Sequence, residues 1–474
     1  MLTRRMVLKD TLMVSAGVAL VAAAPCLVDA APPYVLKLST ADPVPVPPDF
    51  IGLGYEMSSV APIGLLSASN HRYVELIKGI GSEGVIRVGG IVANYTRFAP
   101  NGAIKAERQD TVITQESLEQ FAGFLRKTGW RAIWSVNFAQ GTVDEAVEEV
   151  GAVAKILDSR LLAIEVGNEV EAYGNGQKPF RKPPYTYETY RSEYSQWHAA
   201  IVKAVPGIPF AAPDTATNVE WVEHMAKDAK GDVQLLTTHY YRNGQNHGSA
   251  EQLSHADSRL IDKLLRLRAA SQQSGIPWRM CETNSFSGGG LQGVSNTFLG
   301  ALWTLDFMLL LADYGCSGVN IETGVNQLSF VSHYSPIQDD GKGVNSAGVP
   351  YFGMLAFAAA KTGCSQAMRV GVPETLPNIT AYALGSAAKV SSAVLINRGD
   401  DDVRCSVAGL SLGSHVTAMR LLAPSSTSQT GVTFAGSSVQ PSGRWKPTHT
   451  EHIIGSDVPV PGWSAVVLRD LERR

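Results

Sequence analysis

Acidic and amide side chains stand at the ends of several short apolar runs in this sequence. The run LLAIEV is followed by Gly167, Asn168 and Glu169, and the run WRMC is followed by Glu282. A carboxyl group at the end of a buried strand loses hydration, so it needs a partner or a use. Two carboxyl groups that face one small site can cleave a glycosidic bond: one protonates the leaving oxygen and the other attacks the anomeric carbon. Whether Glu169 and Glu282 face each other depends on the elements that carry them.

Short apolar runs alternate with helical patterns between residues 50 and 361. Helical spacing of apolar residues appears at 117–129, 190–205 and 296–315. This alternation is typical of the α/β class and predicts a (β/α)8 TIM barrel. An open doubly wound sheet is the alternative, but no glycine-rich phosphate loop follows the first run. The eight predicted strands are 50–56, 84–90, 131–138, 161–169, 210–215, 233–241, 278–284 and 318–323.

Such a barrel explains the polar strand ends, because barrel enzymes place their chemistry at the C-terminal ends of the strands. The fourth and seventh strands lie on opposite sides of the barrel, so Glu169 and Glu282 are predicted to meet across its mouth. Asn168 is expected to donate to a sugar 2-hydroxyl group. His239 and Tyr241, which follow the sixth strand, are expected to donate to Glu282 and keep it ionised.

The hydrophobic pattern of the sequence changes after residue 361, where short runs of alternating apolar and polar residues are separated by Gly, Ser, Asp and Pro. This pattern predicts a smaller antiparallel β-sandwich domain. The stretch before the barrel is expected to add one strand to it. The predicted organisation is therefore an export signal at 1–30, the N-terminal sandwich strand at 31–49, the barrel at 50–361 and the sandwich at 362–474.

The first 30 residues predict export. Arg4 and Arg5 precede an apolar stretch and a small-residue cleavage pattern, which resembles a twin-arginine signal. The stretch is marginal for a bilayer span, so a retained anchor is the weaker alternative. We expect a removed signal, a periplasmic or secreted protein, and no stable membrane insertion after removal.

Composition narrows the range of partners. The 474-residue chain has a formal net charge of -3 and no basic block, which argues against nucleic acid as a partner. The 10 histidines form no HExxH-type ligand set and the 5 cysteines no CxxC, so neither metal nor cofactor is expected. A non-catalytic carbohydrate-binding protein and a purely structural exported protein are less favoured, because both carboxyl groups are present.

Longer motifs around these residues resemble glycoside hydrolase family 79, which contains β-glucuronidases and heparanases. The matching motifs are GNE at 167–169, HYY at 239–241, GLGYE at 52–56, YSP at 334–336 and CETNSFSGGGLQGVSNTFLGALWTLDF at 281–307. The resemblance covers essentially the whole chain after the signal. It implies a barrel with a β-sandwich built from both ends of the chain. It also implies a retaining mechanism, with Glu169 as the acid/base and Glu282 as the nucleophile.

The same resemblance implies a pocket for a uronate. Backbone amides of Gly288 and Gly289 and the phenol of Tyr334 are expected to hold the sugar carboxylate, and Glu56 is expected to bond ring hydroxyl groups. A glycine run lets backbone N–H groups converge on an anion.

Three positions depart from the family pattern. Ser287 stands where members usually have tyrosine, Ile91 where a polar residue often reaches the sugar, and Glu322 where related β-glucuronidases have histidine. The expected activity is exo-acting release of terminal β-D-glucuronic acid from glucuronides or glucuronic-acid-containing glycans by double displacement. A heparanase-like endo-β-glucuronidase, and a β-glycosidase for a substituted or non-uronate sugar, remain as alternatives.

Overall fold

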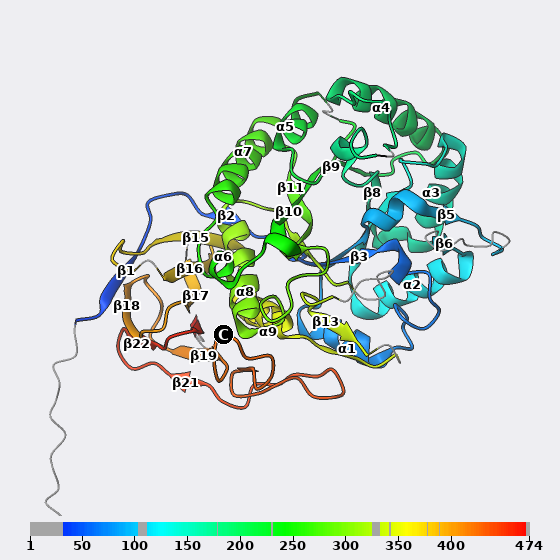
Figure 1. The fold of residues 1–474 in the computed structure, drawn as a ribbon. Coiled ribbons are helices and arrows are strands. Elements are labelled where there is room, and N and C mark those ends of the chain that lie inside the picture. The colour runs from blue at the N-terminus through cyan, green and yellow to red at the C-terminus, as the bar shows by residue number, and fades with distance from the viewer. Residues whose placement is uncertain are drawn as a thin grey trace, which may run out of the picture. The chain divides into compact units, whose positions relative to one another are not determined.

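The predicted strands form a closed parallel barrel, with the helices outside it (Figure 1). Each strand pairs with its neighbours in chain order, and the last strand pairs with the first. The predicted (β/α)8 barrel is therefore confirmed. Its strands are β3 (Ile51–Glu56), β4 (Val85–Gly89), β7 (Arg131–Val136), β8 (Leu161–Val166), β9 (Phe210–Thr215), β10 (Leu235–Gly244), β11 (Trp278–Ser287) and β12 (Val319–Glu322).

The described part of the chain begins after the predicted export signal, so export stays a prediction. From Pro33 onward the chain forms one compact unit. Among the described residues, no helix combines the length and the hydrophobicity that a bilayer span requires. The computed structural model describes residues 32–102, 111–177, 179–228, 231–324, 332–340, 343–376, 378–387 and 389–470.

Local sequence signals set the ends of the barrel helices. At the start of α2 (Gln115–Thr128), Thr114 Oγ1 accepts from the Ser117 amide and Ser117 Oγ accepts from the Thr114 amide, which forms a capping box. The helix ends at Gly129, whose φ of 88° lies in the left-handed region that glycine tolerates. The other helices of more than five residues are α1 (His71–Gly79), α3 (Val143–Leu157), α4 (Tyr187–Ala204), α5 (Val219–Asp228), α7 (Ser258–Ser274), α8 (Phe298–Asp313) and α9 (Val349–Lys361).

Helix α8 joins the barrel to the second sheet. Its residues are buried on almost every side, which explains why its sequence is apolar all round. Asp306 accepts a hydrogen bond of 2.8 Å from the Tyr382 hydroxyl group, and Asp313 accepts one of 2.8 Å from Arg369 Nε. These polar residues of α8 are therefore bonded to strands of the sandwich.

The second sheet is largely antiparallel and folds into the predicted sandwich. Leu36, Leu395 and Val458 belong to different parts of the strand order, yet they share one buried core. The segment before the barrel supplies β1 (Tyr34–Leu38), which lies between β15 (Gln366–Gly371) and β18 (Val403–Gly409). The remaining long strands are β16 (Ile379–Ser386), β17 (Lys389–Asn397), β19 (Val416–Leu422), β22 (Asp457–Val460) and β23 (Ser464–Asp470).

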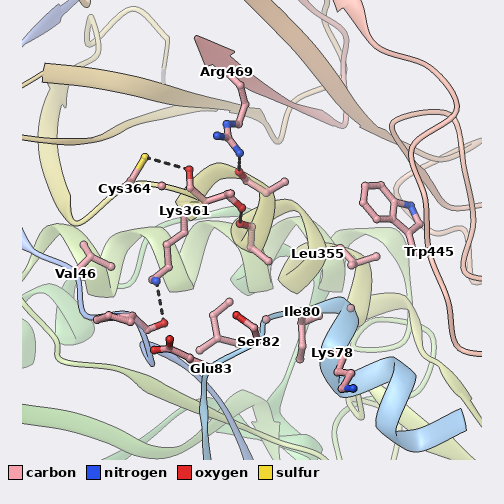
Figure 2. Close-up of a pocket in the computed structure, with 18 of the residues that line it drawn as sticks. Val46, Lys78, Ile80, Ser82, Glu83, Leu355, Lys361, Cys364, Trp445 and Arg469 are labelled. Atoms are coloured by element: carbon pink, nitrogen blue, oxygen red, sulfur yellow. Dashed lines mark hydrogen bonds between the residues drawn. The ribbon is translucent and has the colours of Figure 1, made fainter. Parts of the chain in front are cut away.

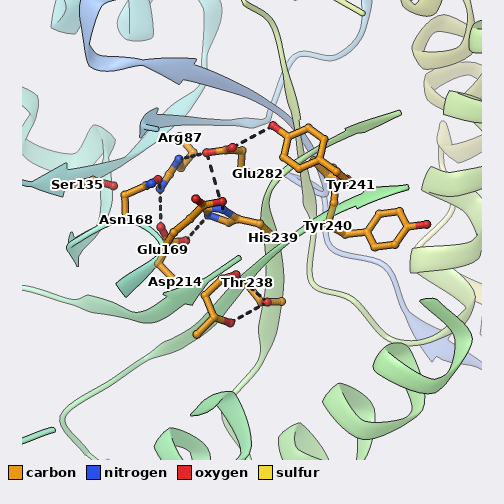
Figure 3. A network of polar contacts seen from close by, with 12 residues as sticks. Arg87, Ser135, Asn168, Glu169, Asp214, Thr238, His239, Tyr240, Tyr241 and Glu282 are labelled. Carbon is orange, nitrogen blue, oxygen red and sulfur yellow. Dashed lines mark hydrogen bonds and ion pairs between the residues drawn. The ribbon is translucent and has the colours of Figure 1, made fainter. Parts of the chain in front are cut away.

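A cavity of about 610 Å³ lies at the amino ends of β3 and β4, between α9 and the sandwich (Figure 2). Lys361 Nζ donates to the Pro48 carbonyl group at 2.9 Å, and Arg469 Nη1 donates to the Ala359 carbonyl group at 2.8 Å. Both cations are therefore tied to the backbone. None of the predicted site residues lines this cavity; they lie at the opposite, C-terminal end of the barrel (Figure 3).

Candidate active site

Glu169 and Glu282 meet at the C-terminal end of the barrel (Figure 3). One oxygen atom of each carboxyl group lies within 4.8 Å of the other. His239 lies beside both: its Nδ1 is 3.3 Å from Glu169 Oε1 and 3.9 Å from Glu282 Oε2. The Glu169 side chain is 29% exposed and that of Glu282 is 12% exposed, so solvent reaches both groups. The two carboxyl groups therefore face one small accessible volume.

The turn after β8 aims Glu169 into this volume. Gly167 has a φ of 98°, and a Cβ atom there would meet Val170 Cγ1 at 2.6 Å, so only glycine fits. Glu169 itself has a φ of 51°, and its amide donates to the Asp214 carbonyl group at 2.8 Å. The Gly-Asn-Glu end of this apolar run is therefore a tight turn that presents a carboxyl group.

Arg87 organises the site from beneath, although the sequence analysis gave it no role. It lies inside β4 and is fully buried, with carboxylate or amide oxygens around its guanidinium group. Burial opposes its charge, but the neighbouring carboxylates raise the pKa of Arg87 above its ordinary value. Its hydrogen bonds run from Nε to Glu165 at 2.9 Å, from Nη1 to Glu282 at 2.8 Å, and from Nη2 to Asn168 at 2.8 Å and Asp214 at 2.5 Å.

Glu282 receives a donor at each oxygen atom. Arg87 donates to Oε2, and the Tyr241 hydroxyl group donates to Oε1 at 2.9 Å. Burial and the charge of Glu282 raise the pKa of Tyr241, so it remains a phenol that can donate. The expected bond from Tyr241 is therefore present. Two donors, one at each oxygen atom, fix the orientation of the Glu282 carboxyl group.

His239 has a different main partner from the one expected. Its Nδ1 is nearer to Glu169 than to Glu282, and its Nε2 bonds Asp214 Oδ1 at 2.8 Å. Burial disfavours a charged imidazole, but Asp214 and Glu282 raise the pKa of His239 well above its ordinary value. Burial likewise opposes ionisation of Asp214, but Arg87 and His239 lower its pKa. Asp214 is thus an anion between two cations, beneath Glu169 and Glu282.

Asn168 and Glu56 are both fixed by hydrogen bonds. Asn168 Oδ1 accepts from Arg87, which leaves the amino end of the amide pointing away from the guanidinium group. Glu56 Oε2 accepts from the Val92 amide at 2.9 Å. Burial raises the pKa of Glu56, and so do the charges of Glu322 and Glu282. Their expected contacts with sugar hydroxyl groups stay predictions.

The residues expected to hold a uronate lie next to Glu282. Gly288 and Gly289 follow β11 with φ values of 79° and 94°, and a Cβ atom on Gly288 would approach Gln245 Nε2 at 3.0 Å. The Gly289 carbonyl group accepts from the Tyr334 amide at 3.3 Å, which ties the glycine loop to Tyr334. The Tyr334 ring stacks on that of Tyr241 with centroids 6.3 Å apart. The structure therefore gathers these residues around the nucleophile candidate.

The three departures occupy different places around the mouth. Ser287 ends β11, and Ile91 is 48% exposed after β4. Glu322 ends β12 and is buried; its charge acts on Glu56. Glu322 therefore adds negative charge close to the expected sugar pocket.

Two groups of side chains among the described residues are close enough to share a metal ion. One comprises Glu165, Asp214 and Cys281, and the other comprises Glu169, His239 and Glu282. In both groups the carboxylates already bond Arg87 or His239, whose positive charges oppose a cation. We assign a metal to neither.

The chain is similar to curated proteins and to solved structures. No family model matches the chain. A β-glucuronidase of Aspergillus niger is 25% identical over 345 residues, which cover 64% of this chain and 62% of the relative. A β-glucuronidase of Neurospora crassa is 24% identical over 401 residues, which cover 70% of this chain and 67% of the relative. The chain thus spans about two thirds of the length of these curated relatives.

Solved structures share the fold over most of the chain. A 4-O-α-L-rhamnosyl-β-D-glucuronidase of Fusarium oxysporum has a TM-score of 0.75 at 18% identity and covers 92% of this chain and 100% of its own. An α-L-arabinofuranosidase of Thermotoga maritima has a TM-score of 0.67 at 14% identity and covers 92% of this chain and 99% of its own.

The fold and the site resemble those of barrel glycosidases that use two facing carboxyl groups. Within that class, the curated relatives are β-glucuronidases, which agrees with the resemblance to glycoside hydrolase family 79.

Proposed function

We propose that the protein is a retaining β-glucuronidase that releases terminal β-D-glucuronic acid from glucuronides or glucuronic-acid-containing glycans. One observation carries the proposal: Glu169 and Glu282 approach within 4.8 Å at the barrel mouth. Retaining glycosidases place their carboxyl groups about 5–5.5 Å apart, whereas inverting enzymes need about 6.5–9.5 Å to admit water. The two β-glucuronidase relatives support the choice of sugar.

In the first step Glu282 attacks the anomeric carbon while Glu169 gives its proton to the leaving glycosidic oxygen. The carbon–oxygen bond to the aglycone breaks, and an ester forms between Glu282 and the sugar. Arg87 and Tyr241 hold Glu282 in the attacking orientation through its two oxygen atoms. His239 bonds Glu169 from the side and steadies it near the leaving group.

In the second step Glu169, now ionised, takes a proton from water while the water oxygen attacks the anomeric carbon. The ester breaks, Glu282 leaves as a carboxylate, and the sugar keeps its β configuration. Asn168 is placed to donate to the 2-hydroxyl group, a contact that strengthens in the transition state. Both steps therefore use the same two carboxyl groups in alternating roles.

We favour exo action because the chain carries a net charge of -3. An endo-acting enzyme for sulfated chains needs a long basic cleft. The test is a panel of 4-nitrophenyl β-glycosides assayed side by side: glucuronide, glucoside, galactoside and xyloside. The proposal expects the glucuronide to have the highest kcat/KM. Nuclear magnetic resonance of the first-formed sugar anomer tests retention, and an α product contradicts it.

A neutral or substituted sugar is the second candidate, and Glu322 is the observation that favours it. Its carboxyl group acts on Glu56 near the expected uronate pocket, and like charges there disfavour a free carboxylate. Higher kcat/KM for the glucoside or xyloside than for the glucuronide in the same panel selects this candidate. Glu322→Gln should then shift the preference toward the glucuronide.

A further inference from the structure

Beneath the catalytic pair lies a buried carboxyl group that the mechanism does not use. Glu165 lies in β8, is fully buried, and accepts at Oε2 from Arg87 at 2.9 Å and from the Ser135 hydroxyl group at 2.6 Å. Its other oxygen, Oε1, meets no donor among the described residues. One carboxylate oxygen of Asp214 lies within 4.8 Å of one carboxylate oxygen of Glu165. An unpartnered carboxylate oxygen beside another buried carboxylate is costly unless a proton lies between them.

The charges of the network favour such a proton. Arg87 and His239 supply two cations, while Glu165, Asp214, Glu169 and Glu282 supply four carboxyl groups. Catalysis needs Glu169 protonated and Glu282 ionised. Asp214 bonds both cations and stays ionised. With Glu169 protonated, the charges of Asp214 and Glu282 balance those of Arg87 and His239. The network is therefore neutral only if Glu165 carries a proton.

Among the described residues packed against Glu165, no charged group other than Arg87 offsets a second negative charge there. The elements packed against it contribute Arg87 from β4, Ser135 from β7, Asp214 from β9 and Cys281 from β11. Burial and the nearby carboxylates raise the pKa of the Cys281 thiol, so it stays neutral. Burial and Asp214 also raise the pKa of Glu165 itself, to about 7.

We propose that Glu165 is a positioning residue that holds a proton shared with Asp214 and thereby leaves Arg87 free to orient Glu282; this role rests on the proposed function. When the proton is lost, a second full charge beneath Arg87 competes with Glu282 for the guanidinium group. Ionisation of Glu165 therefore weakens the support of the nucleophile, without any contact between Glu165 and the substrate.

The shared proton is testable without turnover. Glu165→Gln keeps the shape and the hydrogen bond to Asp214, because the amide donates as the protonated acid does. In the wild type, the pKa of Glu165 is higher in the folded chain than in the unfolded chain. As pH rises, Glu165 therefore loses its proton first in the unfolded state, which stabilises that state. The wild type should thus lose thermal stability relative to Glu165→Gln from about pH 4.5 to about pH 7. A difference in Tm that stays constant across this window overturns the shared proton.

The positioning role is tested by the pH dependence of kcat/KM, with whichever 4-nitrophenyl β-glycoside the wild type cleaves best. This leaving group needs little protonation, so ionisation of Glu169 contributes little to the alkaline limb. Wild-type kcat/KM should fall about tenfold one unit above the pKa of Glu165. In Glu165→Gln that limb should disappear or move up by at least about one pH unit. An unchanged limb overturns the positioning role.

Glu149→Gln is the matched control. Glu149 is also buried, with its pKa raised by burial to about 7, but it bonds Trp134 on the outer side of the barrel. This variant should change the stability curve as Glu165→Gln does and leave the rate profile unchanged. A rate profile that shifts equally in both variants overturns the assignment to Glu165.

Two further outcomes can be told apart: a Glu165→Gln variant that does not fold, and a wild type that cleaves no glycoside. If Glu165→Gln does not fold, Ser135→Ala removes a donor to the ionised form and should move the alkaline limb to higher pH; no movement overturns the proposal. If the wild type cleaves no glycoside, the proposed function fails, and the stability curves alone decide whether Glu165 holds the proton.

Discussion

The bond from Tyr241 to Glu282 gives a test of the nucleophile that leaves the fold intact. Tyr241→Phe removes one hydroxyl group that donates to Glu282 Oε1 at 2.9 Å, and it keeps the ring that stacks on Tyr334. A hydrogen bond to a charged group contributes about 1.5–3 kcal/mol. At about 1.4 kcal/mol per tenfold in rate, its loss should lower kcat/KM by about 10- to 150-fold.

The neighbouring tyrosine supplies the control. Tyr240 points to the opposite face of β10 and donates to Asp257 at 2.9 Å, away from the carboxyl pair (Figure 3). Tyr240→Phe should lower Tm and leave kcat/KM near the wild-type value. Both variants would be assayed with the best substrate of the glycoside panel and melted under the same conditions. Equal losses of rate in the two variants, or a Tyr241→Phe enzyme as fast as wild type, would refute the reasoning.

Three other substitutions test the remaining roles. Glu282→Ala should abolish turnover of every glycoside, and release of an aryl leaving group at the wild-type rate would contradict its role as nucleophile. Glu169→Ala should lose about 10²–10⁴-fold in kcat on glycosides with poor leaving groups and keep much of the first step on activated aryl glycosides. An equal loss on both substrate types argues against an acid/base role. Ser287→Tyr should lower KM for a glucuronide relative to a glucoside, and an unchanged KM ratio would show that a phenol at this position does not contribute to uronate binding.

Much of the architecture follows from patterns that the sequence displays openly. Buried parallel strands read as continuous apolar runs, and each run that ends in a polar residue marks the C-terminal face of the barrel. Glu169 and Glu282 could therefore be placed across the mouth from strand order alone. Tyr241 followed because it lies two residues beyond His239 on the same strand, so both side chains leave the same face.

The residues beneath the pair were missed because their partners come from distant strands. Arg87 and Glu165 are charged residues inside apolar runs, which was a visible signal, but sequence alone does not pair β4 with β8. Asp214 lies near the end of an apolar strand, as Glu169 and Glu282 do. Its backbone φ of 58°, in the left-handed region, could not be predicted from the sequence. The preference of His239 for Glu169 depends on about half an ångström of side-chain geometry. Which carboxyl group a buried histidine bonds is decided by side-chain packing in the folded protein, and the hydrophobic pattern of the sequence does not reveal it.

The position of β1 has a consequence for how the chain is assembled and cut. The first strand to be synthesised lies between β15 and β18, so its hydrogen bonds wait for strands made more than 300 residues later. Contacts that distant in sequence form slowly. Removing residues up to Leu38 would open the sheet between β15 and β18 and expose strand edges able to pair with other molecules. A short trim at the amino end would thus cause aggregation, although the residues lost are far from the catalytic mouth.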